Sequence, residues 1–128
     1  MSETLTGTCL CGGVELEATD LQGFGYCHCS RCQHWVGSSL AGIVVAKENF
    51  RVAKGEDLVK TYESHLAPRN FCSNCGSSLW DDLGAVNFVS AGLFPDLDMK
   101  PSFHQLVAYK ASWEEIGDDA PQFAELPG

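Results

Sequence analysis

The sequence predicts a mainly β protein, and three observations lead to that class. Short runs of alternating apolar and polar residues recur along the chain, and glycines interrupt them frequently. Alternation with a period of two is typical of strands that are buried on one face. The chain has 128 residues, of which 45% are apolar, and its seven cysteines lie close together in three groups. This length is enough for one modest core, so we expect a single domain over residues 1–128.

The predicted elements of the first half follow in chain order. Residues 6–19 are expected to form a strand, a tight turn and a second strand, in which Val14 and Leu16 face the core while Glu15 and Glu17 face water. A helical turn is expected at residues 30–37. Residues 37–64 contain several candidate strands, with a turn at residues 54–57.

The second half continues the same pattern. Residues 70–72 lead into the last cysteine pair, and residues 78–80 lead out of it. Residues 85–94 are expected to form a further buried strand that Pro95 ends. The segment from residue 102 begins as another alternating strand and changes into a polar tail, in which Pro121 argues against a long helix. The sequence contains no internal repeat and no low-complexity segment.

The acidic composition restricts the partners that this protein can have. Eight Lys and Arg residues stand against 17 Asp and Glu residues, which gives a formal net charge of -9. We expect no nucleic-acid partner, because such a surface repels a polyanion. No apolar stretch approaches the roughly 20 residues that cross a bilayer, and no basic segment followed by an apolar run marks a signal peptide. The sequence therefore predicts a cytoplasmic protein without a membrane role.

The spacing of the cysteines predicts metal sites. The three groups are Cys9 with Cys11, then Cys27, Cys29 and Cys32, then Cys72 with Cys75. Zinc needs several ionised ligands that converge on one point, and a CxC or CxxC turn supplies two from one short loop. Disulfides are the competing explanation, but an odd number leaves one thiol unpaired, and cysteines two or three positions apart are poorly placed to pair. Seven ligands fit two zinc ions per chain, one closed site of four and one open site of three.

Glycines indicate how the ligands divide between the two sites. Gly12 and Gly76 each follow the second cysteine of a pair, and glycine tolerates the left-handed backbone that lets amides turn toward thiolates. We therefore expect one closed, structural site, formed by Cys9, Cys11, Cys72 and Cys75.

The remaining three cysteines would then form the open site. Cys27, Cys29 and Cys32 lie within six residues of one another and leave a coordination position free. The alternative is a second structural zinc, with its fourth ligand from one of three histidines, namely His34, His65 or His104. His28 lies between two ligand cysteines, so we expect its side chain to point away from the metal, behind the ligands or at the surface.

These motifs resemble those of the glutathione-dependent formaldehyde-activating enzymes, a family that also includes centromere-protein-V-like proteins. The resemblance spans nearly the whole chain and includes all seven cysteine positions. It rests on GTCLCGGVELEA, YCHCSRCQHWVGS, FCSNCGSSLW and the C-terminal KASWEEIGDDAPQF. It implies small antiparallel sheets built around zinc, similar to the fold of Rab-exchange zinc chaperones. It also implies that the four-cysteine site is structural, and that Cys27, Cys29 and Cys32 hold the reactive, catalytic zinc.

The resemblance further implies an activity, the addition of a thiol to an aldehyde to make S-hydroxymethylglutathione, or its reversal. Formally this is a carbon–sulfur lyase, whose partner is a small-molecule thiol or aldehyde adduct. An open zinc can bind a thiol as thiolate or polarise a carbonyl oxygen. Three thiolate ligands make the ion a weak electrophile, which favours thiolate capture. Glutathione is anionic, so its binding would need cations such as Arg31 or Arg69; the alternative is that both are ordinary solvated arginines.

Aromatic residues flank the cysteine groups and admit two interpretations. Tyr26, Trp35, Phe71 and Trp80 could wall a pocket over the open zinc, or most of them could belong to the core. In the same way, Trp113 and Phe123 could pin the C-terminal segment.

Two other functions remain open from the sequence. One is a non-catalytic zinc module for binding or chaperoning, since a shared fold does not fix function. The other is a redox sensor, whose Cys27, Cys29 and Cys32 would lose zinc and form disulfides. The sequence has neither a hydrolase triad nor a glycine-rich phosphate loop.

Overall fold

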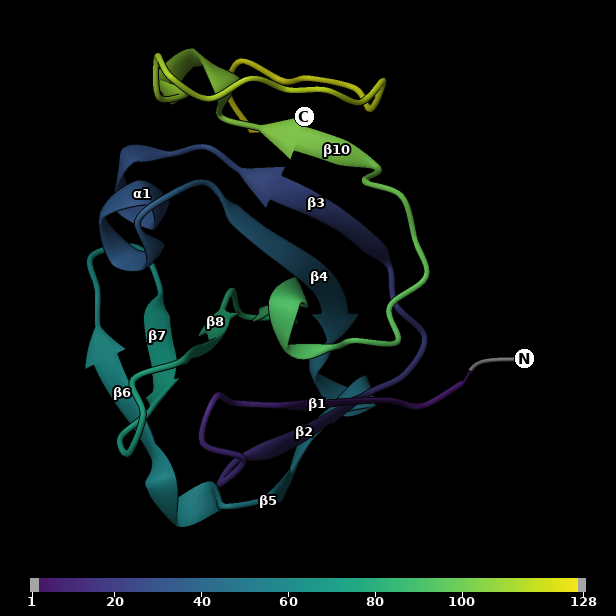
Figure 1. Ribbon diagram of the computed structural model, residues 1–128, viewed down its shortest axis with the longest axis vertical. Helices are drawn as coiled ribbons and strands as arrows, with labels where there is room; N and C mark the ends of the chain where they lie inside the picture. Colours follow the sequence, from purple (N-terminus) through teal and green to yellow (C-terminus); the bar gives the residue numbers. More distant parts are fainter. Residues whose placement is uncertain (1–2, 127–128) are drawn as a thin grey trace.

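The protein folds into two β-sheets, seen in a computed structural model that describes residues 3–126 (Figure 1). The smaller sheet consists of β1 (Leu5–Thr8), β2 (Glu15–Ala18) and β5 (Phe50–Lys54). The larger one consists of β3 (Gly23–Cys27), β4 (Leu40–Ala46), β6 (Val59–Glu63), β7 (Pro68–Cys72), β8 (Ser78–Asp82), β9 (Val86–Ser90) and β10 (Phe103–Gln105). The predicted mainly β class is confirmed.

The strand order is β1-β2-β5 in the smaller sheet and β10-β3-β4-β9-β8-β7-β6 in the larger one. All neighbouring strands run antiparallel except β10 and β3, which are parallel. This parallel pair is a departure from the purely antiparallel sheets that we expected. It arises because the chain leaves β9, crosses the molecule and returns to the edge of β3.

The helical elements are short. They are the helix α1 (Ser30–Val36) and the 3₁₀ turns η1 (Lys47–Asn49), η2 (Glu56–Leu58), η3 (Ala91–Leu93) and η4 (Val107–Tyr109). The predicted helical turn at residues 30–37 is confirmed as α1, which ends at Gly37 in the left-handed conformation with φ 86°. None of the helices in residues 3–126 is long and apolar enough to cross a membrane.

The core lies between the two sheets, with η3 at the centre of the view in Figure 1. The alternation predicted for the first hairpin is confirmed, because Val14 and Leu16 are fully buried while Glu15 and Glu17 are partly exposed. Each fully buried aliphatic side chain contributes about 1.5–3 kcal/mol relative to an exposed one. The largest buried aliphatic side chains of the core are Val14, Leu16, Ile43, Val45, Leu79 and Val89.

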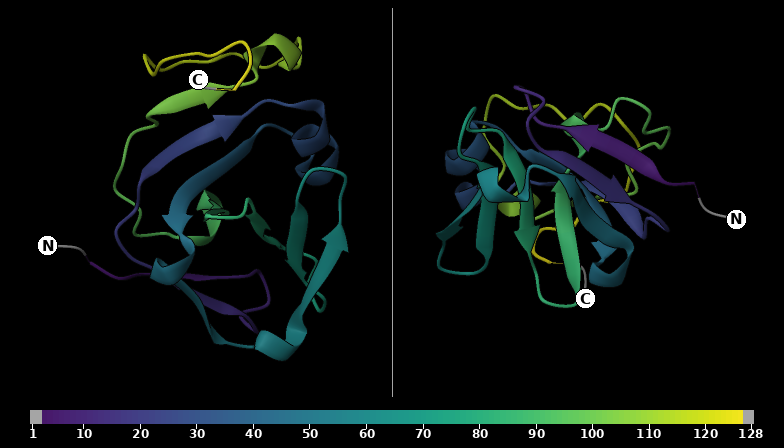
Figure 2. Two further views of the ribbon diagram at one scale, coloured as in Figure 1. Left: turned by 180° about the vertical axis from the view of Figure 1, so that it is seen from behind. Right: turned by 90° about the horizontal axis from the view of Figure 1, so that it is seen from below.

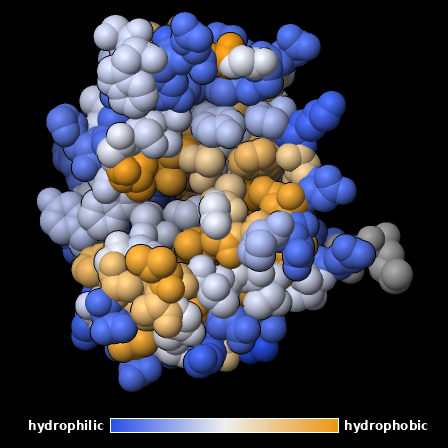
Figure 3. Space-filling model, viewed as in Figure 1, coloured by the Kyte–Doolittle hydropathy of each residue, from blue (hydrophilic) through white to orange (hydrophobic). Residues whose placement is uncertain are grey.

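The strand predicted over residues 85–94 is shorter than expected. It ends at Ser90, and the chain then turns through η3, where the N–H of Phe94 donates to the carbonyl of Ala91 at 3.0 Å. This turn carries the Phe94 ring into the core, where it is 3% exposed. Burial of a large aromatic ring therefore ends the strand before Pro95 is reached. Figure 3 shows apolar surface in the middle of the face seen in Figure 1 and toward its lower left, with mostly hydrophilic surface above.

The C-terminal segment lies outermost beside β3 in Figure 1 and in the view from behind in Figure 2. It doubles back on β10, since His104 N–H donates to the Pro121 carbonyl and Phe123 N–H donates to the His104 carbonyl, both at 2.8 Å. Trp113 and Phe123 were considered as the residues that pin this segment. The Trp113 side chain is 67% exposed and that of Phe123 is 37% exposed, so neither pins the segment by burial in the core. Phe123 contributes through its backbone hydrogen bonds to His104 and Val107.

Candidate metal sites and the adjoining groove

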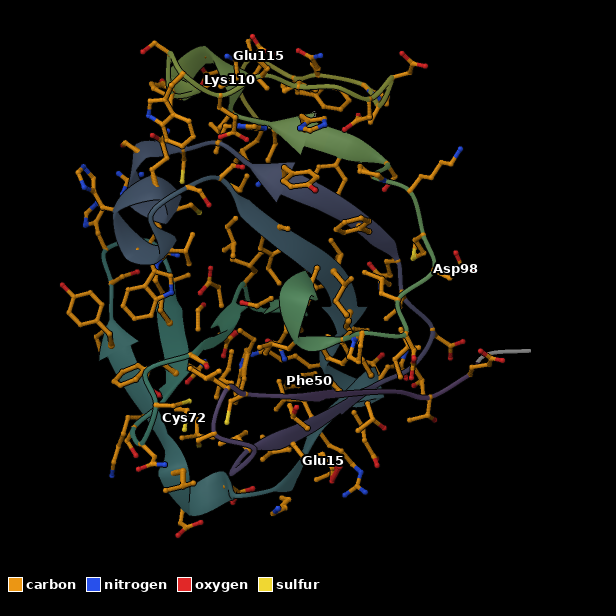
Figure 4. The ribbon with its side chains drawn as sticks, viewed as in Figure 1. Glu15, Phe50, Cys72, Asp98, Lys110 and Glu115 are labelled. Carbon is orange, nitrogen blue, oxygen red and sulfur yellow. The ribbon has the colours of Figure 1, made fainter. Side chains whose placement is uncertain are left out.

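Four cysteines from two distant parts of the chain converge in what we call the four-sulfur cluster, formed by Cys9, Cys11, Cys72 and Cys75. Their sulfur atoms all lie within 4.8 Å of one another. The Sγ of Cys11 is 3.5 Å from that of Cys9 and 3.8 Å from that of Cys72. Cys72 is labelled in Figure 4, at the end of β7 where the β1–β2 turn approaches it. The four cysteines that converge are the same four that we expected, from the glycines, to share one site.

The backbone around the four-sulfur cluster has the geometry that glycine permits. Gly12 has φ 76° and Gly76 has φ 82°, in the left-handed region that other residues rarely adopt. Two amides turn toward sulfur: Val14 N–H donates to Cys9 Sγ at 3.3 Å, and Gly13 N–H donates to Cys11 Sγ at 3.4 Å. Such donors stabilise thiolates and would support a bound cation.

The other three cysteines form the three-sulfur cluster, with Cys27 at the end of β3, Cys29 as the N-cap of α1 and Cys32 inside α1. Their sulfur atoms also lie within 4.8 Å of one another. The backbone N–H of Cys32 donates to Cys29 Sγ at 3.2 Å. None of the seven cysteines, all of which lie in the described part of the chain, forms a disulfide.

The thiols of the three-sulfur cluster share their protons unequally. Hydrogen bonds from the Cys27 and Cys32 side chains lower the pKa of Cys29 to about 2, although burial acts in the opposite direction. The same contacts raise the pKa of Cys27 and of Cys32. The mutual contacts of the three thiols thus favour the thiolate form of Cys29 over that of its two neighbours. A divalent cation would displace the remaining protons, since only thiolates bind it strongly.

The donor set of both clusters fits zinc. Soft thiolates in groups of three or four select zinc among the common divalent ions, and four closes the coordination shell while three leaves it open. No further His, Cys, Asp or Glu in residues 3–126 joins the three-sulfur group. Of the three histidines considered as a fourth ligand, His34 and His65 are exposed, and both ring nitrogens of His104 are engaged elsewhere.

His28 is buried, so of its two expected placements, behind the ligands or at the surface, the surface placement is wrong. It is fully buried, and its Nε2 is 2.9 Å from Nδ1 of His104. His104 Nε2 in turn lies 3.0 Å from both carboxylate oxygens of Asp118, and its ring stacks on Tyr26 at 5.0 Å. His28 Nδ1 is 3.8 Å from Glu114 Oε2 and has no hydrogen-bond partner within residues 3–126. Its side chain therefore ties the cysteine loop to the C-terminal segment.

Arg69 is buried as well, so it is not an ordinary solvated arginine. It is 8% exposed, and its Nη1 donates to Asp81 Oδ2 at 3.1 Å, across the β7–β8 pair. Both of its terminal nitrogens face Cys32 Sγ, at 3.8 and 3.9 Å. Burial raises the pKa of Asp81 to about 6, and the Arg69 charge opposes this rise. Arg31, by contrast, is exposed on the first turn of α1.

A groove of about 810 Å³ lies between α1, β6, β7 and η3. Apolar side chains wall it, chiefly Trp35, Tyr62, Phe71 and Leu93, and five serines line it as well. No charged side chain is among the lining residues. Leu40, another lining residue, pairs with Cys27 in the β3–β4 register. Through Leu40, which packs with Cys27 and Cys32, the groove reaches the surroundings of the three-sulfur cluster, although no cysteine lines it. Its lining also includes Ser77, whose hydroxyl lies 3.2 Å from Cys75 Sγ in the four-sulfur cluster.

The aromatic residues divide between the two interpretations. Trp35 and Phe71 line the groove, as a pocket wall would require. Trp80 packs on Phe50 with ring centroids 4.9 Å apart and belongs to the core contacts. Tyr26 stacks on His104 and does not line the groove.

Sequence reasoning missed Asp81 and Tyr62. A usable signal existed for Asp81, because Arg69 and Asp81 lie at equal distances from Cys75, where a hairpin would pair them across the turn. Tyr62 enters the groove from β6, and no local motif connects that strand to α1. Only the order of strands in the sheet brings the two together.

Comparisons with known proteins relate the chain to one family. A sequence model described as glutathione-dependent formaldehyde-activating enzyme matches residues 4–109. An uncharacterized lyase of Schizosaccharomyces pombe is 32% identical over 75 residues, which are 58% of this chain and 54% of that protein. The chain thus matches about half the length of that relative. A Halomonas elongata protein, assigned provisionally by its name to the glutathione-dependent formaldehyde-activating enzymes, is 26% identical over 128 residues, covering 88% of this chain and 80% of the other.

A solved structure supports the fold independently. The crystal structure of a Rhodobacter sphaeroides protein aligns with a TM-score of 0.61 and 24% identity, over 73% of this chain and 91% of that one. At this identity the likeness concerns the fold alone. Because the sequence model covers most of the chain, the protein belongs to the glutathione-dependent formaldehyde-activating enzyme family.

Proposed function

We propose that this protein is a zinc-dependent carbon–sulfur lyase that makes or splits the adduct of a small thiol with formaldehyde or a related aldehyde. In the forward direction the thiol sulfur bonds to the carbonyl carbon, and the carbonyl oxygen takes up the proton that the thiol loses. The reverse step returns the proton and breaks the carbon–sulfur bond. Family membership supports the reaction class, and the names of the two relatives agree with it.

The observation that carries the proposal is the inequality of the two cysteine clusters. Four sulfurs can satisfy a structural ion, whereas the three-sulfur cluster gathers no fourth ligand from residues 3–126. In this proposal Cys9, Cys11, Cys72 and Cys75 hold the structural zinc, and Cys27, Cys29 and Cys32 hold the catalytic one. A zinc ion in the three-sulfur cluster would supply an open coordination position, at which a thiol ionises at neutral pH.

The groove is the candidate site for the organic part of the adduct. Its apolar wall would bury carbon atoms of the substrate, and its serine hydroxyls would offer hydrogen bonds. Its lining has no cation, and Arg69 is already paired with Asp81. The carboxylates of glutathione would therefore have to lie outside the groove, so a thiol with fewer charges fits this site better.

The test is the rate of exchange between formaldehyde and a thiol, followed by NMR in the presence of the zinc-loaded protein. The expected result is a rate above the spontaneous background, for glutathione or for another member of a panel of thiols. Cys29→Ala should abolish the excess, whereas Ser30→Ala, on the neighbouring exposed residue, should leave it intact. A folded protein with two zinc ions that never exceeds the background with any thiol would contradict the proposal.

A further inference from the structure

The buried guanidinium of Arg69 has contacts that a substrate-binding arginine would not have. It lies on β7 beneath the groove wall, with its guanidinium carbon 5.8 Å from the centre of the Trp35 ring. Its partner Asp81 is 5% exposed and engages it through one oxygen only, since Oδ1 has no partner within the described residues. The two terminal nitrogens, Nη1 and Nη2, also face Cys32 Sγ. A carboxylate arriving from solvent would find this side chain covered and already paired.

The geometry instead places a fixed positive charge against one of the sulfurs of the three-sulfur cluster. Three thiolates around a divalent ion carry a net charge of minus one, and a bound substrate thiolate would make it minus two. Cys27 and Cys32 are both buried, by 95% or more of their surface, so water cannot screen this charge fully. A nearby cation would therefore lower the free-energy cost of accepting a fourth sulfur at this buried position.

We propose that Arg69 is a positioning residue of the three-sulfur cluster, which offsets the negative charge that a substrate thiolate brings. It acts through Cys32, toward which both terminal nitrogens of its fork point. Asp81 fixes the orientation of the guanidinium. Its negative charge also lowers the positive electrostatic potential that the guanidinium exerts at the sulfur atoms. This inference rests on the proposed function, because it assumes that a thiol binds at this cluster.

Two variants of the Arg69–Asp81 pair test the inference. Removing Arg69 alone would leave the Asp81 carboxylate buried without a partner, which destabilises a fold. The double variant R69M/D81N removes both charges and keeps similar volumes. The single variant D81N keeps the guanidinium and removes only the charge that opposes it. For a merely structural ion pair, D81N would be the less stable variant, because it leaves the guanidinium buried without a partner, and thiol affinity would follow stability. The proposal predicts the reverse order of thiol affinity, weaker in R69M/D81N and tighter in D81N.

The measurement is the affinity of 2-mercaptoethanol for the cobalt-substituted protein, read from the sulfur-to-cobalt charge-transfer absorption, with calorimetry on the zinc form as a check. This thiol carries no carboxylate, so recognition of a carboxylate by arginine cannot contribute. Metal content and circular dichroism are recorded for every variant. Arg51→Met is the matched control, because Arg51 lies on the other sheet and pairs with Glu17 at an exposed position.

In the R69M/D81N protein we expect roughly ten- to hundredfold weaker thiol binding at unchanged metal content, the range typical for groups that support metal ligands. D81N should bind the thiol more tightly than the wild type, and R51M should not differ from it. Unchanged affinity in R69M/D81N would overturn the inference and leave the proposed function standing. If the double variant loses metal, D81N decides, and weaker binding there overturns the inference. If the metal-loaded wild type binds no thiol, the proposed function fails as well.

Discussion

Gly55 provides a sharp test of how the turn before η2 supports the four-sulfur cluster. It has φ 79°, and a Cβ placed on it would lie 2.0 Å from the carbonyl oxygen of Gly13 and 2.9 Å from its carbonyl carbon. The clash is with backbone, so no side chain can rotate to relieve it. Gly84 is a matched control, because its φ is 96° but nothing lies within 4 Å of the position that a Cβ would take.

The expected magnitudes follow from these two environments. An L-residue in the left-handed conformation costs about 1–2 kcal/mol, and both Gly55→Ala and Gly84→Ala incur that cost. Gly55→Ala must also move backbone by about 1 Å, and overpacking of this kind typically costs about 1–3 kcal/mol more. A chain of this size has a free energy of unfolding of about 6–19 kcal/mol. Gly55→Ala should therefore fold but lose about 2–5 kcal/mol, and Gly84→Ala about 1–2 kcal/mol.

The assay is urea unfolding of the zinc-loaded proteins, monitored by circular dichroism. Unfolding free energies are compared only between variants with equal m-values. Zinc release to a chelator is a second readout. Gly13 N–H donates to Cys11 Sγ, so displacement of Gly13 should make Gly55→Ala release zinc from the four-sulfur cluster faster than Gly84→Ala does. Unfolding free energies of the two variants within about 0.5 kcal/mol of each other would refute the reasoning, since the two sites would then differ only in backbone strain.

Further predictions concern the two clusters and the C-terminal segment. Cys75→Ala should unfold the chain, because a structural zinc contributes about 10–16 kcal/mol of folding free energy. Cys29→Ala should keep its circular dichroism spectrum and one zinc ion. Equal loss of structure in both variants would contradict the division into a structural and an open site. A mild chelator should remove one ion readily and the other slowly, as measured by released zinc and free thiols, and two equal rates would count against an open site. The N–H of Ala120 and the His104 ring hold the pKa of Asp118 below its ordinary value, so its stabilising contribution is present above the pKa of the unfolded chain and lost as the pH falls through that of the folded state. Asp118→Asn should therefore show a smaller loss of stability than the wild type on acidification below about pH 4, measured by urea unfolding, and parallel acid curves would show that this contact has no such effect.

The grouping of the cysteines could be predicted well because its signal is local. A CxC or CxxC turn places two sulfurs together whatever the rest of the chain does, and the glycines after Cys11 and Cys75 indicated which pairs would share a site. Alternation identified β2 for the same reason, since one buried face shows directly in the order of residues. The three remaining cysteines also come together in the structure, and that they bind a metal as an open site stays a prediction.

The contacts that the sequence did not reveal depend on strand register and on long-range pairing. His28 and His104 are 76 positions apart, and only the parallel pairing of β10 with β3 brings them within 2.9 Å. The burial of Arg69 depends on its register with Asp81. Charged residues are rarely buried unless they are paired, so composition alone favoured an exposed arginine. Burial of a charge is a property of the assembled sheet rather than of the local sequence.

The attachment of the cysteine loop to the C-terminal segment sets an order for biosynthesis. The four-sulfur cluster is complete once Cys75 has emerged from the ribosome, whereas His28 must wait for His104 and for the strand that carries it. A nascent chain can therefore assemble the four-sulfur cluster early, while the loop around Cys27 and Cys29 still lacks the contact between His28 and His104. The loop that carries the three-sulfur cluster therefore gains this support only after the segment around His104 has been translated.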